Sequence, residues 1–257
     1  MTGEVPAGAE ALATRLADLD ARILDAARSA GRDPSELTRI VVTKFHPASL
    51  VEELAALGVR DVAENRQQEL TAKRAALRQA QGPDAAQGPD ASQGPDAVRA
   101  QDPLRWHFVG QIQTKKARAV RAASDVVHSV DRDRLADALH TASPDAPPLD
   151  VFVQVNLTDD PARGGAAPMD VTRLAEHIVA SCPSLRLRGV MAVAPLGEDP
   201  ARAFARLRRA GDAVRAVVPD ATWMSAGMSG DFAAAIAAGA THLRIGTAIT
   251  GPRPVHG

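Results

Sequence analysis

The sequence predicts an α/β protein that folds as a single (β/α)8 barrel of the TIM type. Eight short runs rich in β-branched residues alternate with helical patterns along the chain. The runs are almost continuously apolar, as expected for parallel strands buried on both faces. A length of 257 residues suits one such domain, because these barrels commonly contain about 250 residues. A doubly wound parallel sheet is the structural alternative.

The elements follow one another in a regular order. An amphipathic helix spans 7–30 and ends before Gly31. The strand candidates are 40–44, 61–65, 106–110, 125–130, 151–156, 187–193, 221–225 and 242–246. Seven helical patterns follow the first seven strands. In chain order they are a helix that ends at Gly58, 66–78, a helix around Lys115, a helix that begins at Asp131, 169–180, 201–217 and a helix that ends at Gly239.

One segment interrupts this alternation. Residues 79–103 contain the tetrapeptide Gln-Gly-Pro-Asp three times, at 81–84, 87–90 and 93–96. The segment has almost no apolar residue larger than alanine and so cannot bury enough surface to offset its ordering entropy. We expect a disordered surface loop inserted in one domain that spans 1–257.

Composition excludes several classes of protein. Thirty basic and 31 acidic side chains leave a net charge of -1, which gives no field that would attract nucleic acid. Cys182 is the only cysteine, so no internal disulfide is possible, and a reducing, cytoplasmic location is expected. No uninterrupted apolar stretch of about 18 residues is present, which argues against a membrane span.

The predicted strand ends carry the candidate chemistry, because barrel sites lie at the carboxyl ends of the strands. The sequence predicts a polar ring at this end above an apolar barrel. Lys44 closes an apolar strand, where an ammonium must find a carboxylate, lose its proton or react with a carbonyl. Exposure to solvent or an ion pair with Glu64 is the simpler interpretation.

Two neighbouring turns have the composition of a phosphate site. Residues 225–229 read Ser-Ala-Gly-Met-Ser, and 244–247 read Arg-Ile-Gly-Thr. Their hydroxyls, and glycines that let the backbone approach a ligand, would meet on adjacent strands. Alternatively, Ser229 caps the next helix.

Other residues carry weaker signals. His107 is a lone histidine, which is more often structural than catalytic, and the basic residues around Lys115 are expected on a solvated face, with a smaller chance of a second anion site or nucleic-acid contact. No zinc, P-loop or dinucleotide motif is present.

The motifs taken together resemble the YggS/PROSC family of pyridoxal-phosphate homeostasis proteins. The resemblance covers about 37–251 without the repeat segment. The matching segments are 41–44, 63–65 with 68–69, 106–116, 128–131, 155–156, 189–195, 225–229 and 244–249. Departures occur at Ala63, where the family commonly has glycine, at Gln111, where it has histidine, and at 163–165, where it has Lys-x-Gly.

The resemblance implies a fold like the N-terminal domain of alanine racemase, usually monomeric, that binds pyridoxal 5'-phosphate (PLP). Lys44 would hold the cofactor as a Schiff base, and Arg244 would face the pyridine nitrogen. Asn65 and Met191 would line the ring. The phosphate would be bound by Ser225, Gly227, Ser229, Gly246 and Thr247. A cation beside the pyridine nitrogen keeps it unprotonated, which makes the ring a poor electron sink.

Three functions fit these residues. The first is a carrier or buffer of PLP that serves PLP-dependent apoenzymes and affects amino-acid and keto-acid metabolism. The second is a PLP-dependent racemase, which in the alanine racemase design needs a tyrosine as its second base, and this chain contains none. The third is a phosphate-binding barrel enzyme, such as a sugar-phosphate isomerase, in which Lys44 forms no covalent link.

Overall fold

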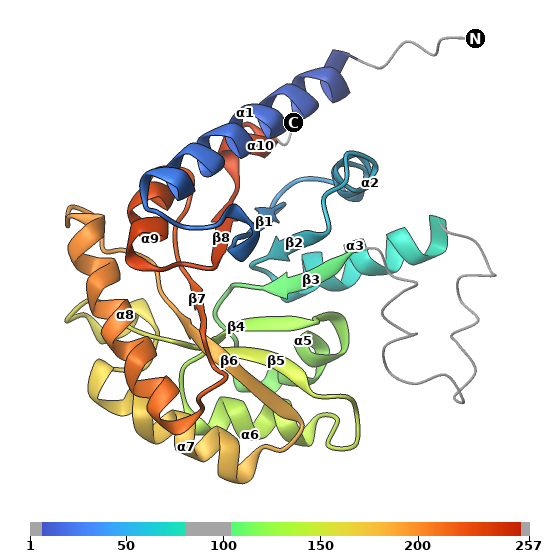
Figure 1. Ribbon diagram of the computed structural model, residues 1–257. Helices are drawn as coiled ribbons and strands as arrows, with labels where there is room; N and C mark the ends of the chain where they lie inside the picture. Colours follow the sequence, from blue (N-terminus) through green and yellow to red (C-terminus); the bar gives the residue numbers. More distant parts are fainter. Residues whose placement is uncertain (1–6, 81–103, 253–257) are drawn as a thin grey trace.

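The computed structural model describes residues 7–80 and 104–252, which form a closed barrel of eight parallel strands (Figure 1). The strands lie around the barrel in sequence order, which excludes a doubly wound sheet. They are β1 (Thr38–Val42), β2 (Asp61–Glu64), β3 (Arg105–Phe108), β4 (Val126–Val130), β5 (Leu149–Gln154), β6 (Leu185–Met191), β7 (Trp223–Ser225) and β8 (His242–Ile245). All eight predicted strands are therefore present, with ends shifted by a few residues.

The first and last strands close the barrel. β1 pairs with β2 through Val42 and Ala63, and with β8 through Val41 and Ile245. Because all strands are parallel, the segments that follow them gather at one end of the barrel. Lys44 follows β1 at this end, between the segments that follow β2 and β8.

Helices cover the outside of the barrel. They are α1 (Ala7–Ser29), α2 (Ala48–Ala56), α3 (Gln67–Ala80), α5 (Ala117–Ala123), α6 (Asp133–Thr141), α7 (Val171–Ser181), α8 (Pro200–Val217), α9 (Phe232–Ala238) and α10 (Thr247–Thr250). None of the helices within 7–80 and 104–252 has the length and apolar character needed to cross a membrane.

The N-terminal helix is an addition to the eight repeated units. α1 packs against α9 and α10, beside β8 (Figure 1). Arg15 on α1 donates from Nε to the carbonyl oxygen of Ile249 at 2.6 Å. This hydrogen bond therefore fixes α1 to the segment that follows β8.

The repeat segment can be compared with the structure only at its start. α3 continues to Ala80, so residues 79 and 80 are helical and not part of a loop. The three tetrapeptide copies lie in 81–103, outside the described residues.

The main apolar core lies between the strands and the helices, and it includes Val41, Leu70, Phe108 and Leu243. The space enclosed by the strands is different. It contains a smaller apolar cluster of Val126, Phe152 and Met191, together with buried histidine, arginine and serine side chains described below. The prediction of an apolar barrel interior is wrong at these positions, because alternate residues of a strand face opposite sides and an apolar run does not show which side is polar.

Candidate functional site

Lys44 lies two residues beyond the end of β1, in a turn with an unusual backbone. The following residue, Phe45, has φ of 69° and is the only residue other than glycine with positive φ in the described part of the chain. Such a conformation is costly for an aromatic residue and has to be held by its surroundings. The Phe45 N–H donates to Oε2 of Glu69 at 2.8 Å. This contact fixes the backbone beside Lys44.

A buried ion pair also contacts the turn that contains Lys44. Lys73 Nζ lies 2.5 Å from Oε1 of Glu64 and donates to the carbonyl oxygen of Thr43 at 2.8 Å. The Thr43 hydroxyl also donates to Glu64, at 2.6 Å. Burial raises the pKa of Glu64, although its contacts with Lys73 oppose the change. Glu64 is therefore already paired with Lys73, and the alternative ion pair between Lys44 and Glu64 is not formed.

Asn65 follows β2 at the same end of the barrel. Its Oδ1 is buried and has no hydrogen-bond partner among the described residues. The backbone of Asn65 is packed closely by Gly110, where an added Cβ would lie 2.0 Å from the Asn65 carbonyl oxygen. A buried acceptor without a donor is costly, so Asn65 is a candidate for contact with a ligand.

The turns after β7 and β8 meet as predicted. The hydroxyl oxygen of Ser229 accepts from the N–H of Ala248 at 3.4 Å, which joins the two turns. Ser229 does not cap α9, because the residue at that position is Asp231 and its side chain makes no capping hydrogen bond. Within the described chain, no acceptor is found for the N–H groups of Gly227, Ser229, Gly246 and Thr247.

Gly227 is required by both backbone conformation and space. Its φ is +89°, and an added Cβ would lie 2.8 Å from Cβ of Ala235 and 3.0 Å from Cα of Phe232. Its carbonyl oxygen accepts from the N–H of Arg244 at 2.9 Å. These contacts hold the turn after β7 directly beside β8.

Arg244 is buried near the upper end of the barrel interior and is held by two hydrogen bonds. Its Nη1 donates to the hydroxyl oxygen of Ser225 at 2.7 Å, and its Nη2 donates to the carbonyl oxygen of Ala192 at 2.8 Å. Burial lowers the pKa of Arg244 to about 10, and Asp231 opposes this change. The guanidinium therefore remains charged at neutral pH.

Sequence reasoning missed one polar residue at this site. Besides accepting from Arg244, the Ser225 hydroxyl contacts Nδ1 of His128 at 2.8 Å. His128 lies at the centre of β4. The mostly apolar sequence around it does not indicate which other strand the histidine contacts. The last predicted residue, Met191, ends β6 and belongs to the small apolar cluster with Phe152.

The basic segment around Lys115 is only partly a solvated face. Arg121 is buried, and it donates to the carbonyl oxygens of Ser184, Ser143 and Pro147. That arginine therefore ties α5 to the loops at the other end of the barrel, and the prediction of a fully solvated basic face is wrong there.

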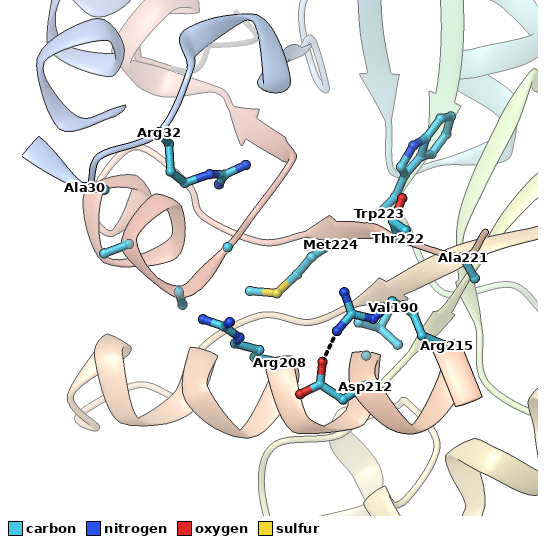
Figure 2. A pocket seen from close by; sticks show the side chains of 14 residues that line it. Ala30, Arg32, Val190, Arg208, Asp212, Arg215, Ala221, Thr222, Trp223 and Met224 are labelled. Atoms are coloured by element: carbon cyan, nitrogen blue, oxygen red, sulfur yellow. Dashed lines mark hydrogen bonds and ion pairs between the residues drawn. The ribbon is translucent and has the colours of Figure 1, made fainter. Parts of the chain in front are cut away.

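A separate cavity of about 330 Å³ lies at the opposite end of the barrel (Figure 2). Arg208 and Arg215 extend into it from α8, and Met224 lies between these side chains and Arg32 in this view. Arg215 is paired with Asp212. This cavity is far from the chain segments that follow the strands, and it does not include any predicted site residue.

The comparison with known proteins identifies the family. The model of the family "Alanine racemase, N-terminal domain" matches residues 14–254. The pyridoxal phosphate homeostasis protein of Pseudomonas aeruginosa is 40% identical over 246 residues, which cover 94% of this chain and 96% of the relative. The chain belongs to the pyridoxal phosphate homeostasis protein family.

Solved structures agree with this membership in the homeostasis family. PipY from Synechococcus elongatus, solved with PLP bound, is 32% identical, with a TM-score of 0.74 and coverage of 93% of this chain and 100% of PipY. Alanine racemase from Corynebacterium glutamicum, at 15% identity and a TM-score of 0.64, shares the fold. The aligned region covers 97% of this chain but 62% of the racemase chain.

Proposed function

We propose that this protein binds PLP, linked covalently to Lys44, and serves in PLP homeostasis. The observation that carries the proposal is the meeting of two turns with unpaired N–H groups at the end of the barrel where Lys44 also lies. PLP bound to PipY and the name of the Pseudomonas aeruginosa relative support this choice of ligand. When bound, PLP supplies an aldehyde that reacts with an amine and a ring that can accept electrons.

The phosphate fits the two turns. The N–H groups of Gly227, Ser229, Gly246 and Thr247 are available as donors, and backbone donors of this kind suit phosphate oxygens. The absence of Cβ atoms at both glycines leaves the backbone accessible. Ser225 differs from these residues, because its hydroxyl is already engaged by Arg244 and His128. We therefore assign Ser225 to the support of Arg244 rather than to direct phosphate contact.

Lys44 is the lysine best placed for the covalent link. The chain has three others, Lys73, Lys115 and Lys116. Lys73 is buried in its pair with Glu64, and the other two belong to a short 3-10 turn before α5. Lys44 is partly exposed at the strand end, where its amine can reach a ligand and exchange protons with water.

The remaining predicted residues would orient the ring. Arg244 presents a permanent charge, and we propose that it faces the pyridine nitrogen and keeps that atom unprotonated. Asn65 offers its unpaired Oδ1, and Met191 offers an apolar side chain at the end of β6. A ring held in this way is a poor electron sink, which suits a carrier.

A carrier explains the chain better than a racemase does. The chain has no tyrosine, so the second base of the alanine racemase design is absent. Lys44 alone could support at most a weak one-base exchange of the substrate proton. We propose a cytoplasmic monomer that holds PLP and releases it to PLP-dependent apoenzymes.

The test is an absorbance spectrum of the protein after incubation with PLP, followed by borohydride reduction and peptide mapping. We expect a visible band near roughly 420 nm and a reduced adduct on Lys44. Lys44→Ala should lose both, because no other lysine lies at this site. Lys115→Ala is the matched control and should keep both.

The outcomes separate the three functions. A band and an adduct on Lys44 without racemisation of alanine would agree with the carrier. Rapid racemisation would favour the enzyme. If the wild-type protein forms neither a band nor an adduct, the PLP proposal fails and a phosphate-binding barrel enzyme becomes the better explanation.

A further inference from the structure

An unbroken series of hydrogen bonds crosses the interior of the barrel. From Arg244 on β8 it runs through Ser225 on β7, His128 on β4 and His107 on β3 to Asp61 on β2. The successive distances are 2.7 Å, 2.8 Å, 2.8 Å and 2.9 Å. We call these five residues the histidine relay. Ser225, His107 and His128 are almost completely buried.

The chemistry of the two ends gives the relay one direction. An arginine can only donate and a carboxylate can only accept. Ser225 therefore accepts from Arg244 and donates its hydroxyl proton to Nδ1 of His128. His128 then donates from Nε2 to Nδ1 of His107, which donates from Nε2 to Oδ1 of Asp61. Burial lowers the pKa of both histidines, so each is neutral and has one proton to donate.

The relay joins two opposite ends of the barrel. Arg244 and Ser225 lie where β7 and β8 end, whereas Asp61 is the first residue of β2. Asp61 is 20% exposed and lines a cavity of about 370 Å³ together with Arg39 and Arg60. One end of the relay is therefore open to solvent at the end of the barrel opposite Lys44.

Arg244 has no carboxylate in direct contact within the described chain, although the charge of Asp231 opposes the lowering of its pKa by burial. Among the described residues, no carboxylate lies within ion-pair distance of Arg244, and its direct partners are a hydroxyl and a carbonyl oxygen. Hydrogen bonds in series polarise one another, and this effect is stronger in a buried, low-dielectric interior. The contacts through Ser225 and the two imidazoles therefore connect Arg244 to the Asp61 carboxylate, in addition to the direct charge of Asp231.

Isolated buried histidines are usually structural, and His242 provides the comparison. Its ring contacts the rings of Phe152 and Trp223 and lies 6.5 Å from the His107 ring and 6.4 Å from the His128 ring, but among the described residues the ring makes a hydrogen bond to Thr241 alone. His107 and His128, in contrast, are bonded at both ring nitrogens. Such two-sided bonding fixes ring orientation and tautomer, and His128 also contacts the Ser225 hydroxyl that accepts from Arg244.

We propose that the histidine relay positions Arg244 and sustains its charge toward the bound PLP ring, so that Asp61 tunes the cofactor from the opposite end of the barrel. The inference rests on the proposed function. In this arrangement Arg244 uses one N–H on Ser225 and one on Ala192, and its other donors are left for the ring. Asp61, His107 and His128 are positioning residues, since they act through Ser225 and Arg244.

The first test examines the relay without cofactor. Nitrogen-15 NMR of the imidazoles should show both His107 and His128 as neutral Nε2–H tautomers at neutral pH, assigned by their loss in single variants. Asp61→Asn should change the nitrogen shifts of both rings. A protonated imidazole or an Nδ1–H tautomer at either residue would overturn the directed relay.

The second test measures the cofactor in the PLP-loaded protein. Asp61→Asn and His128→Gln should each shift the visible band and weaken PLP binding about ten-fold, because each removes a charge-assisted or buried link to Arg244. Asp61→Glu should restore the wild-type spectrum, since it keeps the carboxylate. His140→Gln on α6, where the ring contacts Ser184 outside the relay, is the control and should keep the wild-type band, even if it lowers the melting temperature.

The outcomes distinguish this inference from the proposed function. A wild-type band that is unchanged in both Asp61→Asn and His128→Gln would overturn the relay alone. Asp61→Asn at the exposed strand start still decides the question if His128→Gln does not fold. A wild-type protein without any band would remove the proposed function, and the tuning role with it.

Discussion

Two single residues show how this barrel places unusual backbone at its site. Phe45 keeps a left-handed conformation beside Lys44, at a cost of order 1–3 kcal/mol, and is held there by Glu69. Gly227 keeps positive φ in the turn after β7, where no side chain would fit. Phe45 lies next to Lys44, and Gly227 is one of the residues proposed to bind the phosphate. Only Phe45 is strained, because glycine adopts positive φ without steric cost, and that strain lies beside the proposed Schiff-base lysine.

Gly227→Ala should damage both stability and PLP binding. The new Cβ would meet Ala235 at 2.8 Å in a backbone region that alanine avoids. We expect a loss of about 2–4 kcal/mol in the free energy of unfolding, and at least ten-fold weaker binding because the turn must shift. Urea denaturation and titration with PLP measure the two effects.

Gly230→Ala is the matched control for this prediction. Gly230 lies in the same turn, but an added Cβ there has no heavy atom within 4 Å. It should bind PLP nearly as well as the wild type. Equal behaviour of the two variants would show that the turn is not a built part of the site.

At the scale of elements, α3 acts as a support for the turn after β1. It contributes Glu69 to Phe45, and Lys73 to both Glu64 and the Thr43 carbonyl oxygen. The sequence predicts a helix over 66–78, close to the observed bounds of α3. The sequence pattern could not show that Lys73 is buried against Thr43 and Glu64, because long cationic side chains on helices are usually solvated. The pairing depends on the β1–β2 register, which brings Thr43 beside Glu64.

Lys73→Met should therefore act on stability and on Lys44 together. It leaves Glu64 buried without its cation, and breaking such a pair costs about 3–5 kcal/mol. We expect slower and weaker formation of the Lys44 adduct as well, because the Thr43 carbonyl oxygen loses its donor. Chemical denaturation and stopped-flow absorbance after mixing with PLP would measure both changes.

The double variant Glu64→Gln with Lys73→Met tests the cause. Removal of both charges should cost less than the sum of the single changes, because no buried charge is left alone. Additive losses would show that the two side chains stabilise the fold independently, and the support from α3 would have to be explained by packing.

At the scale of the whole molecule, the fold could be predicted and the barrel interior could not. Eight apolar runs separated by helical patterns are enough to indicate the closed barrel, and glycines beside serine or threonine at two strand ends indicate the turns that we propose for the phosphate. The position of His107 in the sequence does not indicate which residues it contacts. Its role depends on β2, β3 and β4 being neighbours, and on β7 placing Ser225 against His128. Such contacts arise only when the barrel closes.

The buried histidines should make the whole barrel sensitive to mild acid. Burial lowers the pKa of His107, His128 and His242 below the usual 6.5, and positive neighbours such as Arg105 and Arg244 lower it further for His128 and His242. The unfolded chain therefore binds more protons than the folded chain as pH falls below about 6.5. Each histidine can then reduce the free energy of unfolding by up to about 1.4 kcal/mol per pH unit.

Urea denaturation between pH 7.5 and 5.5 measures this loss, in a range where most carboxylates stay ionised. We expect stability to fall with pH in the wild type and to fall less steeply in His128→Gln and His242→Gln, because each removes one group that must be buried neutral. If all three proteins share one slope, the acid sensitivity has another origin, and the neutral imidazoles on which the histidine relay depends would lose their thermodynamic support.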